Sequence, residues 1–180
     1  MSKKLFLLGT AVMMLVVGGV APAAAAQPHL ELYAGYYVPG QSAFDDDLTF
    51  GLRFGGRPTE RFGWQIAGGV FDLNGEEDRP LQGRVGDANA FLVDASFQWF
   101  PGGGNFAIFG GPGFSSIDID LEGTTTDVSD DTFTLHIGAS YLFQIGESFY
   151  LRPDVRFRDF QGDVYDKTDT EASLAFGWNF

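Results

Sequence analysis

The C-terminal segment of this 180-residue chain constrains the fold most, because large apolar side chains alternate there with small or polar ones up to the last residue. Leu174, Phe176, Trp178 and Phe180 fall on one face of the segment. A period of two is the period of a β-strand, whose side chains point alternately to opposite faces. A soluble protein turns the apolar face of such a strand to its core, whereas a strand of a membrane barrel turns it to lipid.

The first residues of the chain have the three parts of a secretory signal peptide. Lys3 and Lys4 precede an apolar run over residues 5–20, and residues 21–26 are small apart from one proline. We therefore predict a cleavable signal peptide over residues 1–26 and one domain over residues 27–180. A retained anchor is the weaker alternative, because the run is short for a spanning helix. The chain contains no cysteine, which excludes a cysteine-linked lipid anchor and disulfides.

The alternation of the last segment recurs along the whole predicted domain. Eight segments carry it, over residues 29–38, 48–55, 62–70, 91–99, 106–121, 133–145, 149–158 and 171–180. In the fifth, the apolar face moves by one residue after residues 110–113, which indicates either a β-bulge or the end of the membrane-embedded part. An even number of strands of about nine to eleven residues is typical of a single-chain outer-membrane barrel.

The connections between these segments also alternate in length. Short links cover residues 55–61, 101–105 and 146–148, and longer acidic links cover residues 39–47, 74–87, 122–131 and 161–170. Short periplasmic turns and longer extracellular loops are typical of outer-membrane barrels, so we expect both termini on the periplasmic side. A soluble lipocalin-like barrel or a β-sandwich is the alternative, because either also has short alternating strands.

Aromatic side chains distinguish the two alternatives, because many of them gather beside the short links. A band of aromatic residues at a membrane interface is common in membrane proteins, and a soluble barrel gives no reason for one. The sequence therefore favours an all-β, eight-stranded, antiparallel up-and-down transmembrane barrel. The aromatic residues of this band are Phe54, Phe62, Trp64, Phe97, Trp99, Phe106, Tyr141, Phe143, Phe149, Trp178 and Phe180.

With these features, the whole predicted domain resembles the small eight-stranded outer-membrane barrels of the OmpA/OmpX-like and opacity-protein-like group. The resemblance implies an integral, monomeric protein of a Gram-negative outer membrane, in contact with its lipid and lipopolysaccharide. It also implies passage to the barrel-assembly machinery with the help of periplasmic chaperones. In that family, the residues that match Leu174, Phe176, Trp178 and Phe180 form the assembly signal. The architecture alone does not imply an activity.

The inward faces of the segments carry charges that must be paired. Eight strands enclose an interior that side chains fill, and an unpaired charge there costs several kcal/mol. We predict a salt-bridge network that plugs the barrel, with Asp72 and Glu171 as further candidate acids. A gated pore or a proton path through the network is the functional alternative. The predicted members are Glu31, Arg53, Asp94, Arg152, Asp154, Arg156 and Arg158.

Catalytic and metal chemistry have weak support in the sequence. His29 follows the cleavage site, and His136 shares an inward face with Ser140, about 13 Å away at strand spacing. A serine on another strand remains open as its partner. Asp118, Asp120 and Glu122 begin like a calcium loop, but the twelfth position is Ser129 instead of a glutamate. We therefore expect no catalytic residue, no cofactor and no dedicated metal site.

The net charge narrows the partners further. Without Lys3 and Lys4, nine basic residues remain against 24 acidic ones, which gives a formal charge of −15. Such a chain repels phosphate groups, so we expect no nucleic-acid binding. We predict a structural or surface-interaction role at the cell surface, with a narrow, porin-like channel for small or hydrophobic solutes as the first alternative. An enzyme that modifies lipid A is the second alternative.

Overall fold

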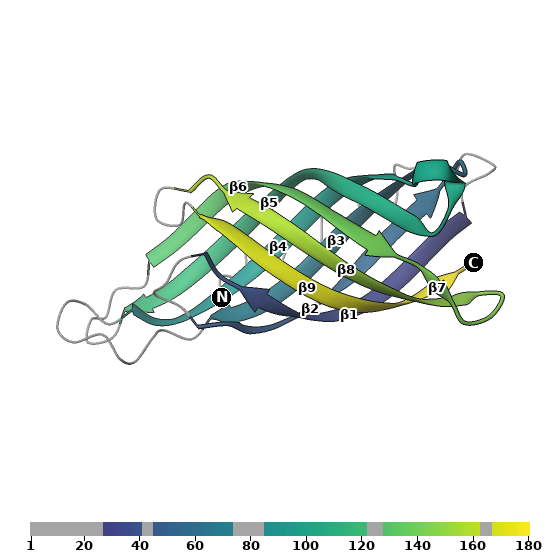
Figure 1. Cartoon of the computed structure of the whole chain (residues 1–180). Helices are drawn as coiled ribbons and strands as arrows, with labels where there is room; N and C mark the ends of the chain where they lie inside the picture. Colours follow the sequence, from purple (N-terminus) through teal and green to yellow (C-terminus); the bar gives the residue numbers. More distant parts are fainter. Residues whose placement is uncertain (1–26, 41–44, 74–84, 122–127, 163–166) are drawn as a thin grey trace.

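The computed structural model describes residues 27–40, 45–73, 85–121, 128–162 and 167–180 (Figure 1). The predicted signal peptide lies outside the described residues. Almost all of the described chain is strand, with one short 3₁₀ helix, η1 (Pro101–Gly103). The strands are β1 (Gln27–Val38), β2 (Asp47–Arg57), β3 (Phe62–Leu73), β4 (Val85–Trp99), β5 (Phe106–Leu121), β6 (Val128–Tyr141), β7 (Phe143–Gln144), β8 (Phe149–Phe160) and β9 (Thr168–Asn179).

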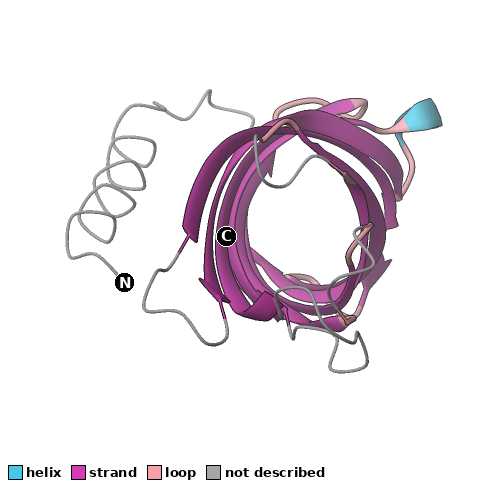
Figure 2. Cartoon of the chain, turned by 90° about the vertical axis from the view of Figure 1, so that its left-hand side faces the viewer, coloured by secondary structure: helices cyan, strands magenta, loops and turns pink. Residues whose placement is uncertain are grey.

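The strands close into one antiparallel barrel. Strands β1 to β5 each pair with the next strand in sequence, β8 pairs with β9, and β1 also pairs with β9. Leu142 separates β6 from β7, but both pair with β8 and together form one stave of the barrel. Viewed along its axis, the sheet is a complete ring (Figure 2). The predicted closed barrel of eight antiparallel strands is confirmed.

Alternate residues of each strand face opposite sides of the wall. In β9, Leu174, Phe176 and Trp178 are exposed on the outside, whereas Ser173 and Ala175 are buried inside. The same division holds around the barrel, where the most exposed apolar side chains, such as Leu32 at 62%, belong to the outward set. The outer wall is therefore an apolar belt, and the polar side chains of the strands lie mostly within.

The two ends of the barrel differ in their connections. Residues 58–61, 100–105 and 145–148 link strands at one end, the short-turn end, and the longer loops link them at the other, the long-loop end. Gly102 and Gly103 have φ values of 69° and 73°, which a tight turn requires and glycine adopts without strain. Gln27 and Phe180 also lie at the short-turn end, since Gln27 pairs with Arg57 and the Phe180 N–H donates to the Pro28 carbonyl (Figure 1).

The aromatic residues of the outer wall contact one another near the short turns. The rings of Phe54 and Trp64 meet edge to face at 5.6 Å between centroids, and those of Trp178 and Phe180 lie 5.3 Å apart. Edge-to-face and tilted pairs at such distances are favourable. These contacts bring aromatic residues together beside the short turns, where the sequence places the band.

Strand β5 differs from one sequence expectation. Its pairing with β4 keeps one register from Ala88↔Ile119 to Trp99↔Ile108, so residues 110–113 contain no bulge, and the register shift lies at Val85/Ala88. Ile117 is fully buried and faces inward. The apolar residues change parity in the sequence because Ile117 lies on the inner face, beside the inward side chain of Ala90. Among the described residues, no helix is long and apolar enough to cross a membrane.

Candidate functional site: the charged interior

The structure places every predicted network residue on the inner side of the wall, with side chains almost completely buried. β1 contributes Glu31, β2 contributes Arg53 and β4 contributes Asp94, whereas β8 contributes the other four. Glu171 on β9 is also buried, but the expectation for Asp72 is wrong, because its side chain is exposed. The four on β8 are Arg152, Asp154, Arg156 and Arg158.

Glu31 organises the part of the interior nearest the short turns. Its Oε1 lies 2.9 Å from Arg152 Nη1 and accepts a hydrogen bond of 2.6 Å from the Tyr150 hydroxyl. Its Oε2 accepts a hydrogen bond of 3.1 Å from Gln65 Nε2. Arg152 Nη2 donates to Gln65 Oε1 at 2.9 Å, which closes a ring of three side chains. Burial of the Glu31 carboxylate is thus compensated by Arg152, by Arg53 at 3.9 Å and by two hydrogen-bond donors.

Arg53 links the middle of the interior to β8 and β9. Its Nη1 lies 2.5 Å from Asp154 Oδ2, and its Nη2 lies 2.9 Å from Ser173 Oγ and 3.5 Å from Glu171 Oε1. The guanidinium carbon also sits 3.9 Å from the centre of the Tyr33 ring, a cation–π contact. Arg53 therefore contacts two residues, Asp154 and Ser173, that each lie more than 100 positions away from it in the chain.

Asp94 holds two arginines at once. Arg156 Nη1 and Arg158 Nη2 each lie 2.5 Å from Asp94 Oδ2. The other carboxylate oxygen, Oδ1, lies 3.5 Å from His136 Nδ1. Removal of Asp94 would leave two buried guanidinium groups without their nearest carboxylate, which is more costly than the loss of an exposed ion pair.

The charged side chains clustered around Glu31, Arg53 and Asp94 balance one another. Four arginines face four carboxylates, those of Glu31, Asp94, Asp154 and Glu171. Several buried polar atoms, among them Arg156 Nη2, Arg158 Nη1 and Asp94 Oδ1, have no hydrogen-bond partner within the described ranges. Buried water commonly satisfies polar atoms of this kind. These ion-paired clusters are thus neutral in themselves and retain polar capacity beyond their ion pairs, and Asp130 and Asp169 add two buried carboxylates nearer the long-loop end.

Several residues of these groups were not in the predicted network. The parity of their positions places Gln65, Tyr150 and Ser173 on the inward face, but parity does not show which side chains they contact. Their role depends on the tilt of the strands, which brings side chains from distant registers to the same height. Inward parity was the available signal in the sequence. It identifies residues that face the interior, but it does not show which of them form hydrogen bonds with each other.

A serine on another strand lies beside His136. Ser96 Oγ and His136 Nε2 are 2.8 Å apart, whereas Ser140 Oγ has no hydrogen-bond partner among the described residues. Gly111 lies opposite His136 and beside Ser96, and a side chain there would meet the backbone of Ala95 and Ser96. Gly111 on β5 has no side chain, and this leaves room for Ser96 on β4 to reach His136 on β6.

Ser96, His136 and Asp94 resemble a nucleophile, a base and an orienting carboxylate, but their surroundings disfavour catalysis. A general base must accept a proton in the reaction. Two arginines already neutralise Asp94, and they would repel a positive charge on His136. All three side chains are nine-tenths or more buried, so a substrate has no direct access to Ser96. The geometry therefore fits a buried polar network better than a hydrolytic site.

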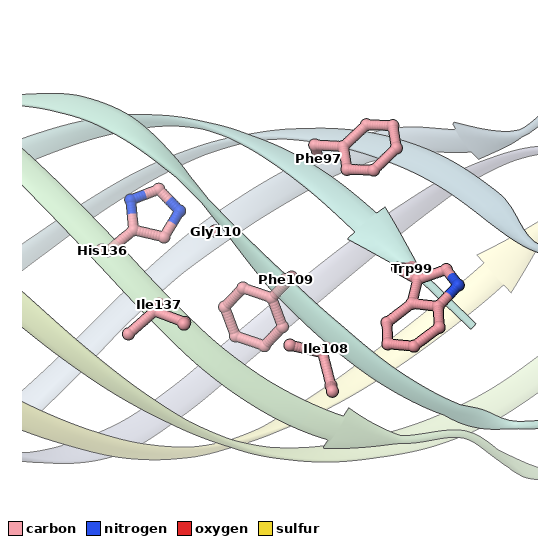
Figure 3. Close-up of a pocket in the computed structure, with 7 residues that line it drawn as sticks. All are labelled: Phe97, Trp99, Ile108, Phe109, Gly110, His136 and Ile137. Carbon is pink, nitrogen blue, oxygen red and sulfur yellow. The ribbon is translucent and has the colours of Figure 1, made fainter. Parts of the chain in front are cut away.

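The outer wall has shallow apolar grooves beside this interior. One groove of about 260 Å³ lies between the outward side chains of Phe97, Trp99, Ile108 and Ile137, with Gly110 among its lining residues (Figure 3). His136 and Phe109 also contribute to its lining, but the His136 side chain is completely buried. A second groove, of about 560 Å³, includes Leu32, Phe50 and Leu174. Both grooves present carbon-rich surfaces suited to lipid chains.

Metal ligands do not cluster in the described part of the chain. No group of three or more His, Asp or Glu side chains there is arranged to hold a metal ion. Asp118 is exposed at the long-loop end of β5, while Asp120 and Glu122 lie outside the side chains that the structure describes. The calcium-like motif of the sequence is therefore only partly within the described residues.

The predicted assembly residues lie on the outside of the barrel at its closing seam. Leu174, Phe176 and Trp178 project from β9, which pairs with β1 on one side and β8 on the other. The Phe149 ring of β8 lies 5.5 Å from the Phe176 ring and 6.5 Å from the Trp178 ring. Phe180 follows at the short-turn end and is 59% exposed. These four side chains form one continuous apolar edge that is accessible from outside.

Comparison with known proteins agrees with the barrel. The family described as "Outer membrane protein beta-barrel domain" matches residues 10–180. No curated protein matches the chain in sequence.

Three similar solved structures illustrate the shared fold. Neisserial surface protein A is 11% identical, with a TM-score of 0.53, and the match covers 89% of this chain and 100% of that one. Ail, the attachment invasion locus protein of Yersinia pestis, is 15% identical, with a TM-score of 0.53 and coverage of 87% and 99%. OprG from Pseudomonas aeruginosa is 14% identical, with a TM-score of 0.55 and coverage of 87% and 97%. At these identities the likeness concerns the fold alone.

Proposed function

The chain belongs to the outer-membrane β-barrel family, and from that premise we propose that it is a closed, non-catalytic barrel with a structural or surface-interaction role. In this proposal the apolar belt contacts lipid, and the charged interior plugs the lumen. The long loops then present an acidic surface to the outside of the cell. The protein acts as a monomer, because β1 and β9 already close the sheet.

The pairing of interior charges is the observation that carries the proposal. Ion pairs and hydrogen bonds link side chains from β1, β2, β3, β4, β8 and β9. An eight-stranded barrel has little interior space beyond that filled by its side chains. A network that joins opposite walls through nearly all of its charges therefore favours a plug over a wide pore.

Conductance in a planar lipid bilayer tests the closed barrel. We expect no discrete, reproducible openings for the folded protein, with the heat-denatured protein as the control. The buried polar atoms without a partner favour the competing candidate, a narrow channel along a hydrated path. Regular openings of one unit size would support the channel and contradict the plug.

The orientation follows from the same proposal. The short-turn end, with both Gln27 and Phe180, faces the periplasm, and the long-loop end faces lipopolysaccharide and the outside. Lys167 is exposed at the long-loop end and Arg61 is exposed at the short-turn end, so the two sites report on opposite sides. Trypsin added to intact cells should cut after Lys167 and leave Arg61 uncut. Cleavage after Arg61 alone would reverse the orientation.

The assembly signal is a separate part of the proposal. We propose that the apolar edge of Leu174, Phe176, Trp178 and Phe180 is recognised by the barrel-assembly machinery after delivery by periplasmic chaperones. Phe180→Ala should lower the amount of heat-modifiable, folded protein in the outer membrane. Phe106→Ala is the matched control, because Phe106 is also exposed beside the short turns but lies in β5. Equal losses for both variants would remove the special role of the last strand.

Hydrolysis of a lipid A acyl ester is the second candidate, because Ser96 and His136 are within hydrogen-bonding distance. A fluorophosphonate reagent reacts with serines that a neighbouring base activates. We expect no labelling of Ser96 and an unchanged acyl pattern of lipid A in cells that produce the protein. Labelling that disappears in Ser96→Ala, together with a shortened acyl pattern, would establish the enzyme instead.

A further inference from the structure

The smaller groove of the outer wall lies near the short-turn end of the barrel. Trp99, the last residue of β4, lines it on the short-turn side, and Phe97 and Ile137 line it farther up the wall (Figure 3). Gly110 of β5 lies among these side chains and has none of its own, which leaves the groove open between them. The carbon-rich lining is continuous with the apolar belt and suits the acyl chain of a lipid.

An exposed arginine lies on the short-turn side of this groove. Arg61 immediately precedes β3, and its carbonyl accepts a hydrogen bond of 2.8 Å from the N–H of Phe100, the residue after Trp99. Phe62, the next residue, pairs in register with Trp99, and its ring lies 5.4 Å from the ring of Phe97. The backbone of Arg61 is therefore adjacent to the strand end that carries the aromatic side chains of the groove.

The positive charge of Arg61 is available to a ligand. Among the described residues, Arg61 forms no ion pair. The neighbouring acid, Glu60, has its carboxylate beside Gly103, whose carbonyl accepts a hydrogen bond from Arg57. Arg57 itself donates to three backbone carbonyls of the short turns. Arg57 is thus occupied by the turns, whereas the guanidinium of Arg61 remains exposed at the end of the apolar belt.

The distribution of charge makes this position unusual in the molecule. In the part of the chain that the structure describes, the exposed basic side chains are Arg61 at the short-turn end and Lys167 at the long-loop end. The full chain has a formal net charge of −13, so the protein as a whole repels an anionic lipid. A preference for such a lipid at one place therefore requires a local base. The long-loop end is unsuited to it, because it exposes Asp46, Asp72, Asp131 and Asp159.

We propose that Arg61 and the groove beside Trp99 form a binding site for an anionic glycerophospholipid, an inference that rests on the proposed lipid contact of the outer wall. One acyl chain lies in the groove over Gly110, and the lipid phosphate accepts hydrogen bonds from the planar guanidinium of Arg61. A zwitterionic lipid has the same phosphate, but its own ammonium group competes with Arg61 for it. In the proposed orientation, the bound lipid belongs to the periplasmic leaflet.

Quenching of Trp99 fluorescence by brominated lipids tests the site. The chain has three tryptophans, so Trp64→Phe and Trp178→Phe together leave Trp99 alone. This protein is titrated in uncharged maltoside micelles with phosphatidylglycerol or with phosphatidylethanolamine, each brominated on its acyl chains. We expect half-quenching at an about fivefold lower mole fraction of phosphatidylglycerol, the factor that one arginine near a membrane surface contributes.

Three variants of this single-tryptophan protein separate the two parts of the site. Arg61→Gln should need equal mole fractions of the two lipids, whereas Lys167→Gln, at the other exposed base, should keep the preference. Ile137→Ala opens one side of the groove at an exposed position. It should raise the half-quenching mole fraction of both lipids by about twofold or more, because the acyl chain loses contacts, without changing their ratio.

The remaining outcomes separate this inference from the proposed function. Equal half-quenching by the two lipids before any further change, a preference that survives Arg61→Gln, or an Ile137→Ala protein without effect would overturn the site and leave the lipid contact intact. A protein that keeps only Trp178 should show no preference, and one of equal size there would also overturn a local site. Absence of quenching at both Trp99 and Trp178 would contradict the lipid contact itself. If the Trp→Phe proteins give no heat-modifiable band, Trp→Tyr replacements carry the same expectations.

Discussion

The outer and inner faces of the barrel are built from alternate residues of the same strands, yet they are held in different ways. The outer face consists of exposed apolar side chains with a few ring contacts among them. The inner face carries buried charges among neutral side chains, and the arginines of the interior lie 2.5–3.9 Å from named carboxylates. The outer face therefore requires only that its side chains be apolar, whereas the inner face requires particular ion pairs.

This difference predicts which substitutions each face tolerates. An apolar side chain in lipid can be exchanged for another with little loss, because lipid adapts to its shape. A buried charge cannot be removed alone, because its partner remains without compensation. Four substitutions test the contrast, in order of decreasing expected effect.

The largest effect should follow the loss of Asp94. Asp94→Ala leaves Arg156 and Arg158 without their shared carboxylate, and we expect a loss of about 3–5 kcal/mol in the free energy of unfolding. Urea unfolding followed by tryptophan fluorescence measures it. Asp72→Ala is the control, since Asp72 is exposed, and should change stability by less than about 0.5 kcal/mol. Equal effects would remove the distinction between the two faces.

A charge on the outer wall should have the next largest effect. Leu32→Arg places a charge on the most exposed position of the belt and should cost about 2–4 kcal/mol if that position lies near the bilayer midplane. Tyr36→Arg, four residues nearer the long loops, should cost only about 0–1 kcal/mol. Folding into liposomes at graded urea concentrations gives both values. A Leu32→Arg protein as stable as the wild type would argue against lipid contact.

A smaller effect is expected where the interior is filled too tightly. A methyl group at Gly51 would meet the Tyr33 ring and the Gly68 carbonyl, so Gly51→Ala should destabilise the barrel by about 1–3 kcal/mol. Gly104 in a short turn has no neighbour within 4 Å of the same position, which makes Gly104→Ala the control. The same urea titration serves, and a harmless Gly51→Ala would show that the interior has spare room.

The smallest effect should come from a neutral hydrogen bond of the interior. Ser96→Ala removes the partner of His136 Nε2 and should cost about 1 kcal/mol, the usual net value of one hydrogen bond. Ser129→Ala, on an exposed residue of β6, should have no measurable effect. A loss above about 3 kcal/mol for Ser96→Ala would place Ser96 in the charge network instead of at its margin.

The fold could be predicted from the sequence because a strand has a short and rigid period. Parity alone places Leu174 and Ser173 on opposite faces, and the aromatic band beside the short links assigns the apolar face to lipid. The same rule misled at Ile117, where an apolar residue faces inward beside the inward side chain of Ala90. Periodicity shows that the polar and apolar residues change parity. It does not show whether the strand contains a bulge or whether an apolar residue faces the interior.

The pairing within the interior could be predicted less well. The sequence identifies Arg53 and Asp154 as inward charges, but their contact joins β2 and β8 across the lumen. Such contacts depend on strand tilt and side-chain length, which residue spacing does not contain. Gln65 and Tyr150 illustrate the limit, because their parity places both on the inward face but does not show that both contact Glu31.

The assignment of lipid to the outer face is the central claim, and the absence of cysteine from the chain allows a direct test. Single cysteines placed at positions 173–178 of β9 can carry nitroxide labels in protein reconstituted into liposomes. We predict that labels at positions 174, 176 and 178 collide with oxygen and not with a water-soluble nickel complex, while labels at 173, 175 and 177 are shielded from both. Strong collision with the nickel complex at 174, 176 and 178 would contradict the account, because water and not lipid would then cover the apolar face.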